Sequence, residues 1–173
     1  EKLMHGCFEE VGVPKCTAEE LEYATALKAT YPPERDVPGI GAKFDAGIAK
    51  QVKALSENMT KPVYDFLMPQ YSGEGFRPGS TDVGDVSWQT PTAQIEVAAW
   101  PAGVPGHSWQ VVACGKSSMA HKAMLCAGKV IASAAIELLE QPALLEKAKS
   151  EFKERSASGY VCPIEPDAVP IAL

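Results

Sequence analysis

His107 has the surroundings best suited to chemistry among the three histidines of the chain. It stands in the sequence PGHSWQ (residues 105–110), where proline and glycine indicate a loop at the end of an apolar segment. Ligand-binding and catalytic side chains concentrate on such loops. An imidazole at this point is able to bind a metal ion or move a proton, although a loop histidine also serves simply to hydrogen-bond the backbone.

Two aspartates and another histidine are further candidates. Asp82 and Asp85 occur in STDVGDVSW (residues 80–88), beside an apolar run. Carboxylates there suit metal ligation or the orientation of a histidine, and equally suit hydrogen bonds to the backbone of a turn. His121 begins a long apolar helix, where the helix dipole favours the neutral imidazole. His121 is either a candidate to hydrogen-bond and orient the ligands of a site, or a structural histidine.

A serine nucleophile is an alternative, because Ser108 directly follows His107. A serine hydrolase would use Ser108, His107 and Asp85. The sequence GHSWQ matches the G-x-S-x-G elbow at only three positions, since Gln110 stands where the second glycine belongs. Phosphate-binding and dinucleotide-binding glycine motifs in the required context are absent.

Composition narrows the class of protein. The chain has 173 residues, of which 46% are hydrophobic, enough for a single domain with a core. Its net charge of −6 and the lack of a basic cluster argue against a nucleic-acid or anionic-membrane partner. We expect neither a membrane span nor a secretory signal, because no apolar run reaches membrane-spanning length and no basic start is followed by an apolar run. Five widely spaced cysteines suggest free thiols in a reducing, cytoplasmic compartment.

The secondary-structure elements that must position these residues are predicted to include both helices and short strands. Helices are predicted at residues 3–11, from 17 to the prolines at 32 and 33, at 42–56, at 118–140, and from 142 onward. Thr17 and Glu20 form a capping box at the start of the second of these. Residues 83–88 and 94–100 are predicted as short strands, and 109–114 form a third apolar run. We therefore expect a helix-rich but incomplete α/β domain.

The helix predicted at residues 118–140 is the most apolar. Its polar residues gather on one narrow stripe, and nearly all the rest are apolar or small, apart from His121. A helix that is apolar around most of its circumference is expected to lie buried between other elements, and its small residues favour close packing on a sheet.

Three segments carry a family resemblance: STDVGDVSW (80–88), PGHSWQ (105–110) and SMAHKAM (118–124), in that order. They resemble the C-terminal part of metallo-amidohydrolases of the aminobenzoyl-glutamate hydrolase type, which are related to aminoacylases and carboxypeptidase-like dinuclear zinc peptidases. The late segment YVCPI (160–164) is similar to the end of such a chain. Residues 79–165 carry this resemblance in their motifs, whereas residues 1–78 resemble the family mainly in helix layout.

The resemblance implies a partial three-layer α/β/α zinc-peptidase domain. Residues 1–173 would be the C-terminal portion of the catalytic domain, without the lid and dimerisation domain and without the N-terminal metal-binding portion. Two divalent ions, zinc or manganese, would be held mostly by that N-terminal portion, which would also supply a glutamate as general base. His107 matches the late histidine ligand of the family, with Asp82 and Asp85 near the site.

The implied activity is hydrolysis of amide bonds in N-acyl amino acids, such as aminobenzoyl-glutamate, or in dipeptides. The full-length form would be a homodimer, and the N-terminal portion of the same enzyme would be the partner of this chain. Because a catalytic zinc needs about three protein ligands, the isolated chain is expected to bind metal weakly and to be inactive. A non-catalytic binding module of the same fold is a further alternative.

Overall fold

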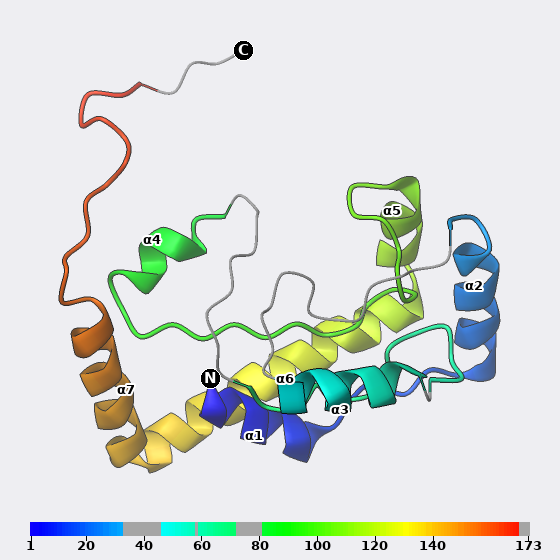
Figure 1. Ribbon diagram of the computed structural model, residues 1–173, viewed down its shortest axis with the longest axis horizontal. Helices are drawn as coiled ribbons and strands as arrows, with labels where there is room; N and C mark the ends of the chain where they lie inside the picture. Colours follow the sequence, from blue (N-terminus) through cyan, green and yellow to red (C-terminus); the bar gives the residue numbers. More distant parts are fainter. Residues whose placement is uncertain (33–45, 58, 72–80, 170–173) are drawn as a thin grey trace. The chain divides into compact units, whose positions relative to one another are not determined.

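The computed structural model describes residues 1–32, 46–57, 59–71 and 81–169. Seven helices are defined in these residues (Figure 1): α1 Lys2–Val11, α2 Ala18–Lys28, α3 Ala46–Glu57, α4 Val83–Ser87, α5 Trp109–Gly115, α6 Ser118–Glu140 and α7 Pro142–Arg155. The chain divides into two compact units. The first comprises Glu1–Pro78 with Gln94–Ile136, and the second comprises Gly79–Ala93 with Glu137–Leu173.

Helices α1 and α6 form one core of the first unit. Cys7 and Phe8 of α1 pack with the buried α6 residues Cys126, Val130 and Ala134. The apolar side chains of an extended segment, Ile95 and Val97 among them, pack against the same core. This arrangement removes one face of α6 from water and provides most of its stabilisation.

A second core joins α2 to α5 and to the start of α6. It consists of Ala24, Leu27, Val63, Cys114 and Met119. Polar contacts reinforce it. The buried Gln110 side chain donates a hydrogen bond to the Thr30 hydroxyl over 3.2 Å, and the Tyr31 hydroxyl donates to the carbonyl of Ala102 over 3.0 Å. These contacts fix both ends of the loop that carries His107.

The second unit is held by aromatic and polar contacts of its own. Pro142 occupies the first turn of α7, where its missing N–H costs nothing. The Tyr160 hydroxyl hydrogen-bonds the Asp85 carboxylate of α4, and the Tyr160 ring lies 5.9 Å from that of Trp88, measured between centroids. Asp85 and Trp88 of the STDVGDVSW motif therefore contact Tyr160 of the late YVCPI segment within this unit.

The expected α/β fold, and with it the three-layer α/β/α domain, is wrong. No residue in the described ranges lies in a strand. Residues 94–100 are extended, but they have no strand partner in the part of the chain that is described. The alternation that suggested a strand has a different cause, because Ile95 and Val97 bury one side of the extended segment against α1 and α6.

The predicted strand at residues 83–88 and the third apolar run at residues 109–114 are mostly helical. Residues 83–87 form the single turn of α4, where Val83 and Val86 share one side at a spacing of three residues. Ser108 begins α5 as its N-cap, with its hydroxyl accepting a hydrogen bond from the Val111 N–H over 3.4 Å. The apolar run at residues 109–114 is too short for its pattern to distinguish a helix from a strand. The N-cap at Ser108 is the feature that marks it as a helix.

Two of the helical features predicted from the sequence are confirmed. Helix α6 has the predicted bounds, and the Thr17–Glu20 capping box is present at α2. Helix α3 is described from Ala46, and the predicted start at residues 42–45 lies outside the described residues. The expected burial of α6 on most sides is wrong, since several large apolar residues on it are exposed. Within the described residues, no helix is long and apolar enough to cross a membrane.

Candidate functional site

The loop before α5 presents His107 to solvent. Ala102, at the start of this loop, is buried, and its N–H donates to the carbonyl of Pro62 over 2.8 Å. At the other end, Ser108 caps α5 and Gln110 is buried. His107 therefore projects from a loop whose two ends are fixed, which is a suitable way to hold a ligand side chain in one place.

The backbone at His107 is strained. Its φ is 55°, and it is the one non-glycine residue with positive φ in the described part of the chain. A residue held in this left-handed region costs about 1–3 kcal/mol, and such positions cluster at functional sites. The conformation turns the chain sharply just before the N-cap of α5 and directs His107 away from the core.

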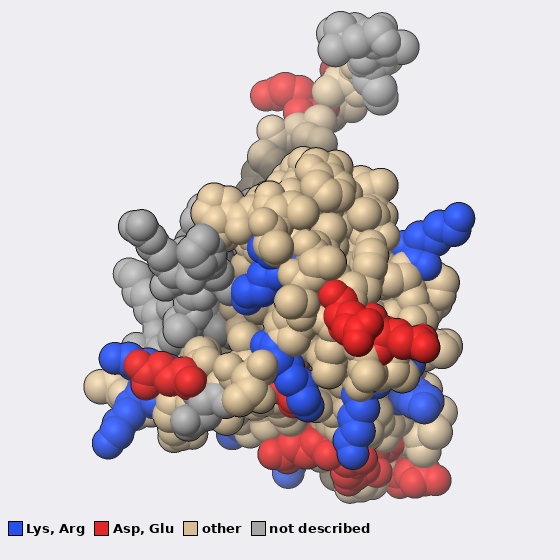
Figure 2. All heavy atoms as spheres, turned by 90° about the vertical axis from the view of Figure 1, so that its right-hand side faces the viewer, with Lys and Arg blue, Asp and Glu red and all other residues tan. Residues whose placement is uncertain are grey.

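The surface around His107 carries few charges. No Asp, Glu, Lys or Arg occurs from Val97 to Gly115. In Figure 2, which views the side on which α2 and α5 lie, a broad area without charged residues occupies the upper part, at the level of α5. Trp109 and Val112 of α5 are 61% and 78% exposed. An imidazole next to uncovered apolar side chains is typical of a site that another surface completes.

The remaining predicted site residues are divided between the two units. His121 is exposed in the first turn of α6, in the unit that carries His107. Asp82 and Asp85 belong to the second unit and are both exposed. Asp85 accepts the hydrogen bond from Tyr160, and this hydrogen bond raises the pKa of that phenol above its usual value. Asp85 thus has a structural partner within its own unit.

The donor set does not fit a complete metal site. Among residues 1–32, 46–57, 59–71 and 81–169, no group of three or more His, Cys, Asp or Glu side chains is placed to hold an ion. A catalytic zinc needs about three protein ligands and an open position. In these residues His107 offers a single imidazole, so we derive no reaction step through a metal from this chain.

The serine alternative is not supported by the geometry around Ser108. Its hydroxyl accepts a hydrogen bond from the Val111 N–H, which is the work of a helix cap. No hydrogen bond joins Ser108 to the His107 ring within the described structure, so the serine is not activated there.

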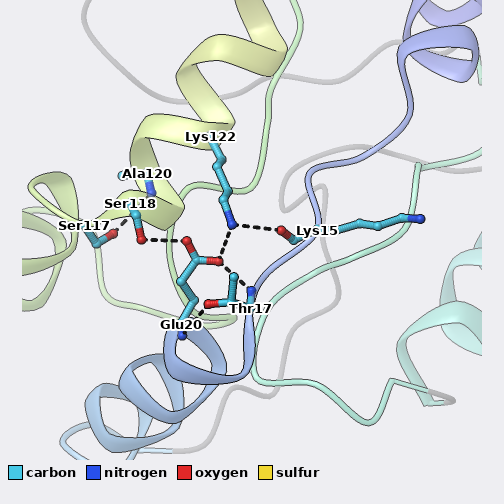
Figure 3. A network of polar contacts seen from close by, with 7 residues as sticks. All are labelled: Lys15, Thr17, Glu20, Ser117, Ser118, Ala120 and Lys122. Atoms are coloured by element: carbon cyan, nitrogen blue, oxygen red, sulfur yellow. Dashed lines mark hydrogen bonds and ion pairs between the residues drawn. The ribbon is translucent and has the colours of Figure 1, made fainter.

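A buried carboxylate that the sequence did not single out as a charged centre lies near the start of α6 (Figure 3). Glu20 of α2 accepts hydrogen bonds from the Lys122 ammonium over 2.8 Å and from the Ser118 hydroxyl over 2.6 Å. The Thr17 N–H donates to it over 2.7 Å as part of the capping box. Lys122 also donates to the carbonyl of Lys15 over 3.2 Å.

These donors stabilise the ionised form of Glu20. They lower its pKa from 4.5 to about 2, with the Lys122 hydrogen bond as the largest cause, and outweigh the opposing effect of burial. The donors come from Thr17, just before α2, and from Ser118 and Lys122 of α6, so the carboxylate links the starts of these two helices. The Glu20 side chain is 8% exposed and both of its oxygens accept hydrogen bonds, so we assign it a structural role.

His5 is a second residue whose environment the sequence did not reveal. Its position on the polar side of the first helix predicts a solvated side chain, but only 20% of the side chain is exposed. The ring Nε2 lies 2.9 Å from the carbonyl of Met68, 63 residues away in sequence. A contact at this sequence separation leaves no local signal.

Comparison with known proteins gives one curated relative. The chain is 32% identical over 177 aligned residues, covering its whole length, to a subunit of the p-aminobenzoyl-glutamate hydrolase of Escherichia coli (strain K12). No protein-family model matches the chain, and no solved structure matches it.

The alignment covers 36% of the relative, so the chain spans about a third of that protein's length. The similarity extends over residues 1–78 as well, where the motifs alone carried little resemblance. This result confirms that the whole chain resembles a part of an aminobenzoyl-glutamate hydrolase-like protein.

Proposed function

We propose that this chain is the C-terminal portion of the catalytic domain of a hydrolase that cleaves amide bonds in N-acyl amino acids, aminobenzoyl-glutamate first among them. The observation that carries the proposal is the 32% identity over the whole chain to a p-aminobenzoyl-glutamate hydrolase subunit. Dipeptides, which share the amide bond and the free amino-acid carboxylate, are the next substrates to test. The lid and dimerisation domain would lie outside these residues.

His107 would supply one ligand to a site for two zinc or manganese ions. Three observations support this role: the exposed imidazole, the strained backbone that presents it, and the fixed ends of its loop. The other ligands and the general base would come from the N-terminal portion of the same enzyme. Asp82, Asp85 and His121 remain candidates to contact the substrate or to support the ligands.

The partner of this chain is accordingly the rest of the hydrolase, and the complete enzyme would be a homodimer. The relative is itself named as a subunit, which supports a larger assembly. The isolated chain is expected to be inactive, because its described residues place no group of three or more His, Cys, Asp or Glu side chains to hold an ion, whereas a catalytic zinc needs about three protein ligands. We place the enzyme in the cytoplasm on the grounds of its free cysteines.

The test is hydrolysis of p-aminobenzoyl-glutamate, followed by release of p-aminobenzoate. The isolated chain and the complete hydrolase that contains it are compared, each before and after dialysis against a chelator. Activity in the complete hydrolase alone, lost on chelation and restored by zinc or manganese, supports the proposal. Turnover by the isolated chain, or activity that survives full metal removal, contradicts it.

A further inference from the structure

Helix α6 has an exposed apolar face on the side opposite its core contacts. The buried residues Cys126, Val130 and Ala134 define the core side. At about 100° per residue, the opposite side is lined by His121, Met124, Leu125, Gly128, Ile131, Ala132, Ala135 and Ile136. The four large apolar residues among them are 53–65% exposed. We call this surface the outer face of α6.

The outer face has no Asp, Glu, Lys or Arg and has room for close approach. The two lysines of this stretch project from its flank, where Lys122 is engaged with Glu20 and Lys129 is exposed. Along the centre of the face run Gly128, Ala132 and Ala135, and a Cβ added to Gly128 would meet nothing within 4 Å. A row of small residues bordered by isoleucine and leucine lets another backbone pack closely. Lone exposed apolar residues are ordinary, but a continuous face of them indicates a covering surface.

The size of the face argues against a second copy of the chain as that covering surface. Fifteen residue steps of helix span about 22 Å, and a helix is about 10 Å wide, so the face offers roughly 220 Å². A stable dimer buries about 800 Å² on each partner. The face becomes adequate when its partner is held in the same polypeptide or subunit, because packing there carries no separate cost of association.

We propose that the outer face of α6 is the surface on which the rest of the hydrolase polypeptide packs. This inference rests on the proposed function, and the similarity to a protein of which nearly two-thirds has no counterpart in this chain supports it. The occupant is therefore the part of the hydrolase outside these 173 residues. It would bring an apolar surface that meets Leu125, Ile131 and Ile136 and that approaches Gly128 closely.

Cysteine labelling tests the surface directly. Ala132→Cys places a thiol at the centre of the outer face, and Lys129→Cys places a matched thiol on the charged flank of the same helix. Both are made with Cys162→Ser, which removes the one exposed native cysteine in the described residues. Each variant is labelled with a maleimide in the isolated chain and in the complete hydrolase. We expect the thiol at position 132 to react at least tenfold more slowly in the hydrolase, while the thiol at 129 reacts at a similar rate in both.

Three other outcomes are informative. Equal labelling at position 132 in a hydrolase that still cleaves p-aminobenzoyl-glutamate overturns the surface and leaves the proposed function standing. Protection at 132 that grows with the concentration of the isolated chain, together with dimers in sedimentation, assigns the face to a second copy and also overturns the inference. Protection in a hydrolase that cleaves no N-acyl amino acid supports the surface and contradicts the proposed function.

Gly128→Leu provides a second measurement that does not depend on labelling. The isolated chain is expected to keep its helical circular dichroism, because the added side chain enters open space and leucine favours helix over glycine. The complete hydrolase carrying this change is expected to lose most of its soluble, active form. Unchanged activity and yield of that variant would overturn close packing on this face.

Discussion

The Glu20 cluster and the His107 loop both belong to the first unit, yet the contacts of one are complete and the other is exposed. The Glu20 carboxylate is buried and bonded to a lysine, a serine and a backbone N–H, all from this chain. His107 is exposed, strained and set among uncovered apolar side chains. The contrast distinguishes groups that stabilise this chain from an exposed group for which we propose partners in the rest of the hydrolase.

Substitutions should affect the two regions in opposite ways. In the complete hydrolase, His107→Ala is expected to lower kcat/KM for p-aminobenzoyl-glutamate by about 100-fold or more, or about 2.7 kcal/mol. The free energy of unfolding should change little, since the side chain is exposed. Steady-state hydrolysis and urea unfolding measure the two effects.

Ser108→Ala is the matched control for His107→Ala. It should cost about 1 kcal/mol of stability through the lost cap of α5 while most activity remains. Equal loss of activity in both variants would mean that the loop acts only as a structural unit, or that Ser108 takes part in the reaction.

The Glu20 cluster should respond in stability. Glu20→Gln removes the negative charge that accepts hydrogen bonds from Lys122 and Ser118. It is expected to lower the free energy of unfolding by about 2 kcal/mol. Glu19→Gln changes the exposed neighbour and should stay within about 0.5 kcal/mol of the original chain. Urea denaturation of the isolated chain followed by circular dichroism compares them, and similar effects of the two changes would refute the assignment.

The pH dependence of stability is a further test of the role of the ionised Glu20 carboxylate. Because the pKa of Glu20 falls from 4.5 to about 2 on folding, its stabilisation is complete above pH 4.5 and is lost as the pH falls towards 2. The difference in unfolding free energy between the original chain and Glu20→Gln should be constant from pH 7 to 5 and shrink below pH 4.5. A difference that instead grows below pH 4.5 would contradict the ionised, hydrogen-bonded carboxylate.

The smallest expected effect concerns the strain at His107. Glycine adopts positive φ freely, so His107→Gly should be as stable as the original chain or more stable by up to about 1 kcal/mol. His107→Ala keeps the strained conformation and should not gain. Thermal unfolding of the two variants, measured side by side, tests this ordering. If alanine is the more stable, the backbone is not strained there.

Sequence patterns predicted the long helices well and the short segments badly. The apolar periodicity of α6 and the Thr17–Glu20 box are strong local signals, and both elements formed as predicted. The pattern of apolar residues cannot distinguish the two-residue period of a strand from the 3.6-residue period of a helix in segments as short as 83–88 and 109–114. Both segments are helical for most of their length. Residues 94–100 alternate as a strand does, but tertiary packing of Ile95 and Val97 explains that pattern.

The candidate site was visible in part. The Pro-Gly sequence before His107 predicted a loop, and the structure places His107 in a loop, where it is exposed. The pairing of Glu20 with Ser118 and Lys122 joins residues about 100 positions apart, so no local pattern contains it. The apolar character of α6 predicted burial on most sides, but several of its large apolar residues are exposed. Periodicity shows which faces of a helix are apolar, but not which partner covers them.

The most direct test of the central claim is a calorimetric titration of zinc into the isolated chain and into the complete hydrolase, each with its His107→Ala variant. The account predicts no stoichiometric binding to the isolated chain, and stoichiometric binding to the hydrolase that the variant weakens or abolishes. Tight, stoichiometric binding to the isolated chain that disappears in His107→Ala would contradict it. These residues would then contain a complete metal site, and Asp82, Asp85 and His121 would be the ligands to examine.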